Sequence, residues 1–318
     1  MRILRVLAPL VIAVAALSAC APTPQAQPAP AAAEQTPTST PTPAATGPVE
    51  AFGGDCAHAL PDASAVVGYE AVPVPATGPV GIRTLGGIGC TWYNAADEFQ
   101  SVSLHALPVD DVPATMRGAF ESVTCLQSYD WQQCHLGGTA AGTWVLVSAP
   151  ALDEAGAAPD LAPALAAALA SAGAWPDPRA ATPSEDWWES VDCAQLETEA
   201  DIAGAFAPHP FEAGYPSGFG DSPLTDVLAP TDQWCPWYSS DAGTRIWMNL
   251  LPGAGAQWDD AAFADGTPVE VAGAVAAVLV TEDGSEVLYA TDGANVLRVR
   301  EAPVPLPDLA TRVFAALS

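Results

Sequence analysis

Hydrophobic positions along this chain fall mostly into short runs with a period of two, separated by turns rich in glycine, proline and acidic residues. This alternation predicts antiparallel strands at 100–107, 143–148, 245–250, 269–271, 275–281, 286–290 and 296–300. Two segments, 160–170 and 308–317, instead carry apolar residues at helical spacing. Runs of strands with helices at the ends predict an α+β fold.

The folded part of the chain is predicted to be a duplication. Gly54-Asp55-Cys56-Ala57 recurs as Val191-Asp192-Cys193-Ala194, and Cys90-Thr91-Trp92-Tyr93 recurs as Cys235-Pro236-Trp237-Tyr238. We therefore expect two similar tandem domains, 50–174 and 188–318, joined by a proline-containing linker at 175–187. Each domain should be an antiparallel sheet with a short N-terminal helix, capped by Asp55 or Asp192, and a C-terminal helix.

The N-terminal segment reads as an export signal. Arg2 and Arg5 precede an apolar run that ends in Leu17-Ser18-Ala19-Cys20, and this run is too short for a membrane span. The Leu-Ser-Ala-Cys ending resembles a bacterial lipobox, and this resemblance implies that residues 1–19 are a lipoprotein signal peptide and that Cys20 is lipidated. Residues 20–49, rich in alanine, proline and threonine, should form a disordered spacer after the lipidated cysteine, because they carry too little apolar surface to fold.

Charge and composition narrow the classes of function. The 318-residue chain has a formal net charge of −28 and no lysine; all nine basic residues are arginine. So acidic a chain is not expected to bind nucleic acid, because it cannot neutralise phosphates. The missing lysine excludes Schiff-base chemistry and phosphate-loop lysines.

Seven cysteines divide into one lipidation site and an even set. Cys20 accounts for the odd residue, and six cysteines in an exported chain favour disulfides. Six cysteines allow fifteen connectivities, and the internal repeat selects Cys56–Cys90, Cys125–Cys134 and Cys193–Cys235. The alternative is a metal site, but the chain contains no Cys-x-x-Cys pair. We expect no metal and no other cofactor.

The leader, the Pro/Thr spacer, the Asp-Cys-Ala start and the Cys-x-Trp-Tyr strand together resemble actinobacterial cell-envelope lipoproteins. The resemblance implies that the chain is cleaved before Cys20, acylated there and held at the outer side of the cell membrane. It also implies a small one-disulfide α+β domain after the spacer. It assigns no catalytic residues, because this group has no settled activity.

Candidate site residues are few. Trp187 and Trp188 lie at the domain junction and Tyr215 lies in a glycine-rich loop, so we expect all three to line a ligand groove between the domains. His58 is expected to be a surface or capping residue. His105 should be exposed, since it alternates with apolar neighbours on its strand.

The sequence favours a non-catalytic, lipid-anchored binding or interaction protein outside the cytoplasm. Its partners would be the membrane, through the lipid, and an envelope protein or a cell-wall glycan. One alternative is a hydrolase of wall polymers whose carboxylates are brought together by the fold. The other is a structural envelope protein without a ligand.

Replacing Cys20 by Ser should leave an unprocessed precursor, because the thiol that receives the lipid is absent. Intact-mass analysis of the membrane-extracted wild-type protein should give a chain that begins at an acylated Cys20. A wild-type chain that begins elsewhere, with a free Cys20 thiol, would show the prediction to be wrong.

Overall fold

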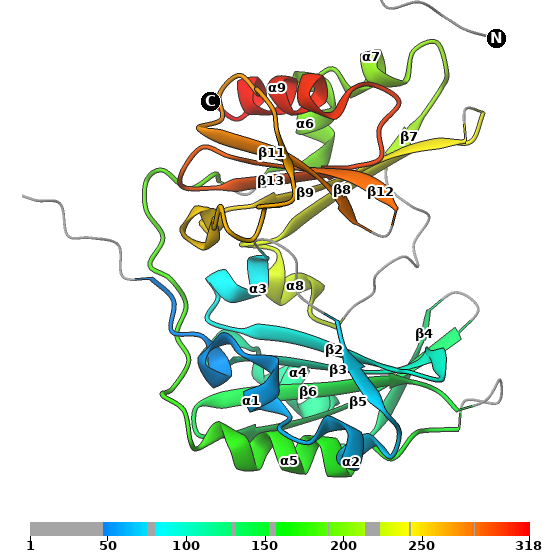
Figure 1. Cartoon of the computed structure of the whole chain (residues 1–318), viewed down its shortest axis with the longest axis vertical. Helices are drawn as coiled ribbons and strands as arrows, with labels where there is room; N and C mark the ends of the chain where they lie inside the picture. Colours follow the sequence, from blue (N-terminus) through cyan, green and yellow to red (C-terminus); the bar gives the residue numbers. More distant parts are fainter. Residues whose placement is uncertain are drawn as a thin grey trace, which may run out of the picture. The chain divides into compact units, whose positions relative to one another are not determined.

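The computed structural model describes residues 47–74, 80–128, 131–152, 157–189, 191–213, 223–241, 243–282 and 284–318. They contain two antiparallel sheets with helices, an α+β fold of two similar tandem sheet domains (Figure 1). The predicted signal peptide, Cys20 and nearly all of the spacer lie outside the described residues.

The first sheet has the strand order β1-β2-β3-β6-β5-β4. Its strands are β1 (Ala71–Pro73), β2 (Ile88–Asn94), β3 (Asp97–Pro108), β4 (Thr124–Ser128), β5 (Trp131–Ala140) and β6 (Thr143–Pro150). The accompanying helices are α1 (Cys56–Ala59), α2 (Ala63–Val67), α3 (Gly81–Thr84), α4 (Ala114–Ala119) and α5 (Ala162–Ala172), with short 3₁₀ turns η1 (Ala51–Gly54) and η2 (Val109–Asp111).

The second sheet has the order β10-β11-β12-β13-β9-β8-β7. Its strands are β7 (Glu212–Ala213), β8 (Gln233–Ser239), β9 (Thr244–Leu251), β10 (Thr267–Pro268), β11 (Ala276–Glu282), β12 (Ser285–Thr291) and β13 (Val296–Arg300). Its helices are α6 (Cys193–Glu199), α7 (Ile202–Phe206), α8 (Thr225–Leu228) and α9 (Leu306–Ala316), with the 3₁₀ turn η3 (Ala254–Gln257).

The two sheets share their strand order and their register. Read from β7, the second sheet runs β7-β8-β9-β13-β12-β11, which matches β1-β2-β3-β6-β5-β4 strand for strand; β10 is an addition at its edge. The register places two equivalent rows of buried residues across the sheets: Cys90, Leu104, Val147 and Leu136 in the first, and Cys235, Met248, Val299 and Leu288 in the second. The expected duplication of the fold is therefore confirmed.

Each N-terminal helix begins as the sequence predicts. Asp55 Oδ1 accepts the N–H of Ala57 at 2.8 Å, and Asp192 Oδ1 accepts the N–H of Ala194 at 2.9 Å. These caps satisfy backbone donors that the helix itself leaves unpaired. The next helices, α2 and α7, are capped in the same way by Asp62 and Asp201.

The disulfides join Cys56 to Cys90, Cys125 to Cys134 and Cys193 to Cys235, the pairing that the repeat predicts. Disulfides persist in oxidising compartments, so the folded part belongs outside the cytoplasm. Trp92 and Trp237 lie two residues after the strand cysteines, and each is almost fully buried in the same core as its own cysteine.

Helices cover one face of each sheet, where the main cores lie (Figure 1). The apolar residues at 269–271 do not form the expected strand. After β10 only the Val269 N–H still donates to β11, at Ala277 O, 3.1 Å; Val271 packs in the core beneath α9, and the Ala272 N–H donates to Thr311 Oγ1 at 3.2 Å. The alternating pattern at 269–271 thus reflects packing against a helix.

One hydrophobic cluster contains residues of both halves. Leu224 and Val227, at α8, pack with Leu107, Trp144 and other buried residues of the first half. The predicted linker also contacts the first sheet domain, because the Ala181 N–H donates to the Thr84 carbonyl at 2.8 Å. It also pairs with the last residue of the predicted spacer, through an antiparallel bridge between Val49 and Arg179.

Replacing Cys193 and Cys235 by Ala should lower the free energy of unfolding by about 4 kcal/mol in the loop-closure estimate, because the bond closes a long loop. Their separation is 42 residues. Urea unfolding followed by tryptophan fluorescence measures the loss. The matched control removes Cys125 and Cys134, which are 9 residues apart and should cost about 3 kcal/mol. A larger loss in the control would contradict the prediction.

Candidate ligand pocket

The first sheet domain contains a cavity of about 560 Å³ at the end of its sheet. This volume is within the usual range for small-molecule sites. The walls come from α2 and the turn after it, the start of β3, the end of β6 and the start of α5. The lining residues are Val66, Val67, Gly68, Tyr69, Asp97, Gln100, Ser101, Val102, Ala149, Pro150, Ala151, Leu152, Pro159, Asp160, Leu161, Pro163 and Ala164.

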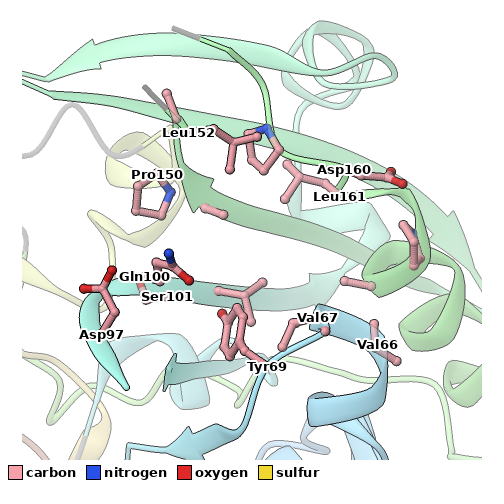
Figure 2. A pocket seen from close by; sticks show the side chains of 17 residues that line it. Val66, Val67, Tyr69, Asp97, Gln100, Ser101, Pro150, Leu152, Asp160 and Leu161 are labelled. Carbon is pink, nitrogen blue, oxygen red and sulfur yellow. The ribbon is translucent and has the colours of Figure 1, made fainter. Parts of the chain in front are cut away.

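Figure 2 shows how polar and apolar side chains divide the cavity. Asp97, Gln100 and Ser101 gather at one end, and Asp160 lies at the other. The walls between them are formed largely by valine, leucine, proline and alanine side chains, with the ring of Tyr69 among them. The cavity therefore offers an apolar interior with hydrogen-bonding groups at its ends.

Among the described residues, the equivalent corner of the second domain carries a larger side chain on its helix. Asp62 and Asp201 cap equivalent helices, so Val67, the last residue of α2, corresponds to Phe206, the last residue of α7. Phe206 is 1% exposed and stacks on Phe211, with ring centroids 5.2 Å apart. A valine in place of this phenylalanine leaves space in the first domain.

The C-terminal helices show a similar small-for-large difference at a cavity position, although Leu165 is larger than its equivalent, Ala310. Buried residues fall at the same spacing in both: Leu161, Ala164, Leu165 and Ala168 before and in α5, and Leu306, Leu309, Ala310 and Val313 in α9. Ala164, which lines the cavity, thus corresponds to Leu309, which is fully buried. Two small side chains, at Val67 and Ala164, open the cavity in one copy of a shared fold.

Three polar side chains have defined roles at the cavity. Burial raises the pKa of the Tyr69 hydroxyl, so it stays protonated at neutral pH and can donate a hydrogen bond. Gln100 Oε1 accepts from Asn94 Nδ2 at 2.9 Å, which directs its amide nitrogen away from that partner. Asp160 Oδ1 accepts the N–H of Ala162 at 3.2 Å and so caps α5.

The structure places Trp187 and Trp188 beside each other in the second domain. They line a smaller cavity of about 390 Å³, whose described walls come from 185–199 and from the end of α9. Trp188 packs edge-on against Phe314, with centroids 5.6 Å apart, and Trp187 covers Gly253. The described residues therefore do not bring these two side chains to a groove between the domains. Tyr215 lies outside the described residues, and ligand binding by the three remains a prediction.

The expected exposure of His105 is wrong. His105 lies on the face of the first sheet opposite the main core, and its Nδ1 is buried with no hydrogen-bond partner among the described residues. Burial, with a further contribution from His135, lowers its pKa to about 4. The alternation along β3 correctly predicted that His105 lies on the face opposite the main core. The sequence could not show that other residues also pack over this second face.

A row of small polar side chains accompanies His105 on this face. His135 Nδ1 is 2.7 Å from Ser148 Oγ, and Thr91 Oγ1 is 3.1 Å from Ser103 Oγ. Burial lowers the pKa of His135 to about 4, so its neutral imidazole can accept the Ser148 proton. His135 and Ser148 are each only 3% exposed, which leaves a substrate no access to this serine and histidine.

His58 lies partly at the surface, as expected. Its ring stacks on Trp175 at 4.2 Å between centroids, and its Nδ1 is 3.9 Å from Asp55. In the described ranges no three His, Cys, Asp or Glu residues gather as a metal site, and no helix there is both long and apolar enough to cross a membrane.

Comparison with known proteins gives no match to a protein family, to a curated protein or to a solved structure. The site therefore rests on the geometry of this chain. An alignment of the two repeats on Asp62 and Asp201 could have shown that Val67 stands where the second repeat has Phe206. The sequence alone would not show where this smaller side chain leaves a cavity.

The fold should lose stability as the pH falls from about 6.5 to about 4. Both buried histidines have a folded pKa near 4, below the ordinary 6.5, so the unfolded chain takes up protons first and the native state is penalised as the pH falls. The penalty should level off below pH 4, at about 3 kcal/mol for each histidine. Urea unfolding across this pH range measures it.

The double variant His105→Asn/His135→Val carries the residues of the equivalent second-domain positions, Asn249 and Val287. It should reduce the slope of stability against pH between 4 and 6.5. His209→Asn, at an exposed histidine, is the matched control and should leave the slope unchanged. An equal slope in the double variant and the wild type would contradict the assignment.

Proposed function

We propose that this protein is a non-catalytic, lipid-anchored binding protein of the cell envelope. Its first domain binds a small, largely apolar ligand in the cavity between α2, β3, β6 and α5. The lipid on Cys20 and the spacer hold this domain outside the membrane. The second domain repeats the fold with its equivalent corner filled.

A single observation carries the proposal: one of two matching corners is hollow. Val67 and Ala164 line the cavity, whereas the equivalent Phe206 and Leu309 are buried in a closed core. The second domain shows that this fold can close the corner with apolar side chains, which would be the more stable packing. An open apolar cavity with polar groups at its ends is the usual form of a small-molecule site.

The extracellular part of the proposal has separate support. The sequence from Arg2 to Cys20 has the features of a lipoprotein leader. The three disulfides fit an oxidising compartment.

The test is a variant that closes the cavity, Val67→Phe/Ala164→Leu, made in the chain from Ala21 onward, which contains every described residue. The probe is N-phenyl-1-naphthylamine, a neutral apolar molecule whose fluorescence rises in an apolar site. We expect the wild type to bind the probe and the closed variant to bind it at least tenfold more weakly, because the imported side chains occupy the space.

Thermal unfolding serves as the control for folding, and the closed variant should be at least as stable as the wild type. Phe206→Val is the matched variant in the second domain. It should lower stability by about 1–3 kcal/mol without weakening probe binding. A wild type that does not bind the probe, or a stable closed variant that binds it equally well, would contradict the proposed site and favour a structural role.

A further inference from the structure

The cavity is lined by two acidic residues and by no basic one. Asp97 and Asp160 lie at opposite ends, and none of the arginines in the described parts of the chain contributes to the walls. The sequence contains no lysine that could do so. The described lining therefore carries negative charge at both ends of an apolar interior.

The N-terminus of α5 opposes this negative charge. The N-terminus of α5 opens at the cavity through Leu161, Pro163 and Ala164, and a helix N-terminus carries about half a positive charge. However, the Ala162 N–H already donates to Asp160, and Pro163 has no N–H to offer. Two carboxylates outweigh a half charge that is already capped, so the local field favours a cation.

The rest of the lining suits a cation attached to an apolar body. The face of a tyrosine ring attracts ammonium groups, and Tyr69 lines the cavity beside the valines of α2. The neutral Tyr69 hydroxyl and the Ser101 hydroxyl can accept hydrogen bonds from an amine. The chain's net charge of −28 adds a long-range attraction for cations.

We propose that the ligand of this cavity is a cationic amphiphile, with an amine or quaternary ammonium group and an apolar body that fits a volume of about 560 Å³. The inference rests on the proposed function and adds the charge of the ligand. It excludes fatty acids and phosphate-bearing lipids as preferred ligands, because their head groups would meet Asp97 or Asp160.

The test compares three probes of one chain length below their micellar concentrations: decyltrimethylammonium, decanoate and the neutral decyl glucoside. Calorimetry at pH 7 uses the chain from Ala21 onward. Decyltrimethylammonium should bind at least tenfold more tightly than decanoate, and the ratio should fall in 0.5 M salt because screening weakens charge interactions.

The variant Asp97→Asn/Asp160→Asn should reduce the affinity for the cationic probe about tenfold or more and change that for decyl glucoside little. Asparagine also caps helices, so α5 should remain intact. The matched control is Asp110→Asn/Asp226→Asn, which removes the same charge at exposed carboxylates outside the cavity and should leave the affinities nearly unchanged.

The outcomes separate the two proposals. Decanoate or decyl glucoside binding as tightly as the cation would overturn this inference alone. An equal loss of cation affinity in the control variant would also overturn it, because the preference would then come from net charge. If no probe binds and the naphthylamine probe does not bind either, the proposed function fails and the inference fails with it.

Discussion

The structure depends on one covalent contact that occurs twice, the disulfide between the first residue of an N-terminal helix and the second strand of its sheet. Cys56–Cys90 and Cys193–Cys235 each attach a helix of only 4 or 7 residues to a core. Helices this short are not stable alone, because nucleation costs more than a few hydrogen bonds return. The bond fixes where the helix lies, and the cap aspartate before it fixes where the helix begins.

The same contact sets the register of both sheets. The strand cysteine and the tryptophan two residues later face the core together, and a shift of one residue would turn both outward. Cys90 lies opposite Leu104, and Cys235 lies opposite Met248, so each core is built outward from the disulfide. With the register held in this way, residues at the far corner of the sheet are free to differ. This explains how one copy can contain a cavity where the other has stacked phenylalanines.

The sequence predicted the features that depend on local pattern. The repeated Asp-Cys-Ala and Cys-x-Trp-Tyr segments gave the duplication and the disulfides, and alternation gave β3, β6, β9 and β11 to β13 to within a few residues. It did not give β4 or β5. The sequence did not predict which residues pack over each face of the sheets. His105 was expected at the surface because it alternates with apolar residues along its strand. The pattern of one strand cannot show which other residues pack over its second face. The residues at 269–271 were read as a strand because packing on a helix produces the same alternation. The cavity was not predicted because its walls come from segments far apart in the sequence, such as Val67 on α2 and Ala164 on α5. Their distance in space cannot be read from the pattern of either segment.

The two copies keep the same core and differ on both sides of it. On the side of the helices, Val67 and Ala164 line a cavity in the first copy, whereas the equivalent Phe206 and Leu309 of the second are buried. On the other side, the first sheet has Ser103, His105 and Ser148, whereas the equivalent residues of the second are Trp247, Asn249 and Arg300. There Arg300 lies over the ring of Trp247 at 5.4 Å. Core residues are constrained by packing density, so a duplicated core changes slowly in shape. The residues at the helix corner and on the opposite sheet face differ between the copies, and this divergence argues against two equivalent ligand sites. The duplication therefore supplies two domains with a shared core and different surfaces, and the proposed ligand site belongs to the first of them.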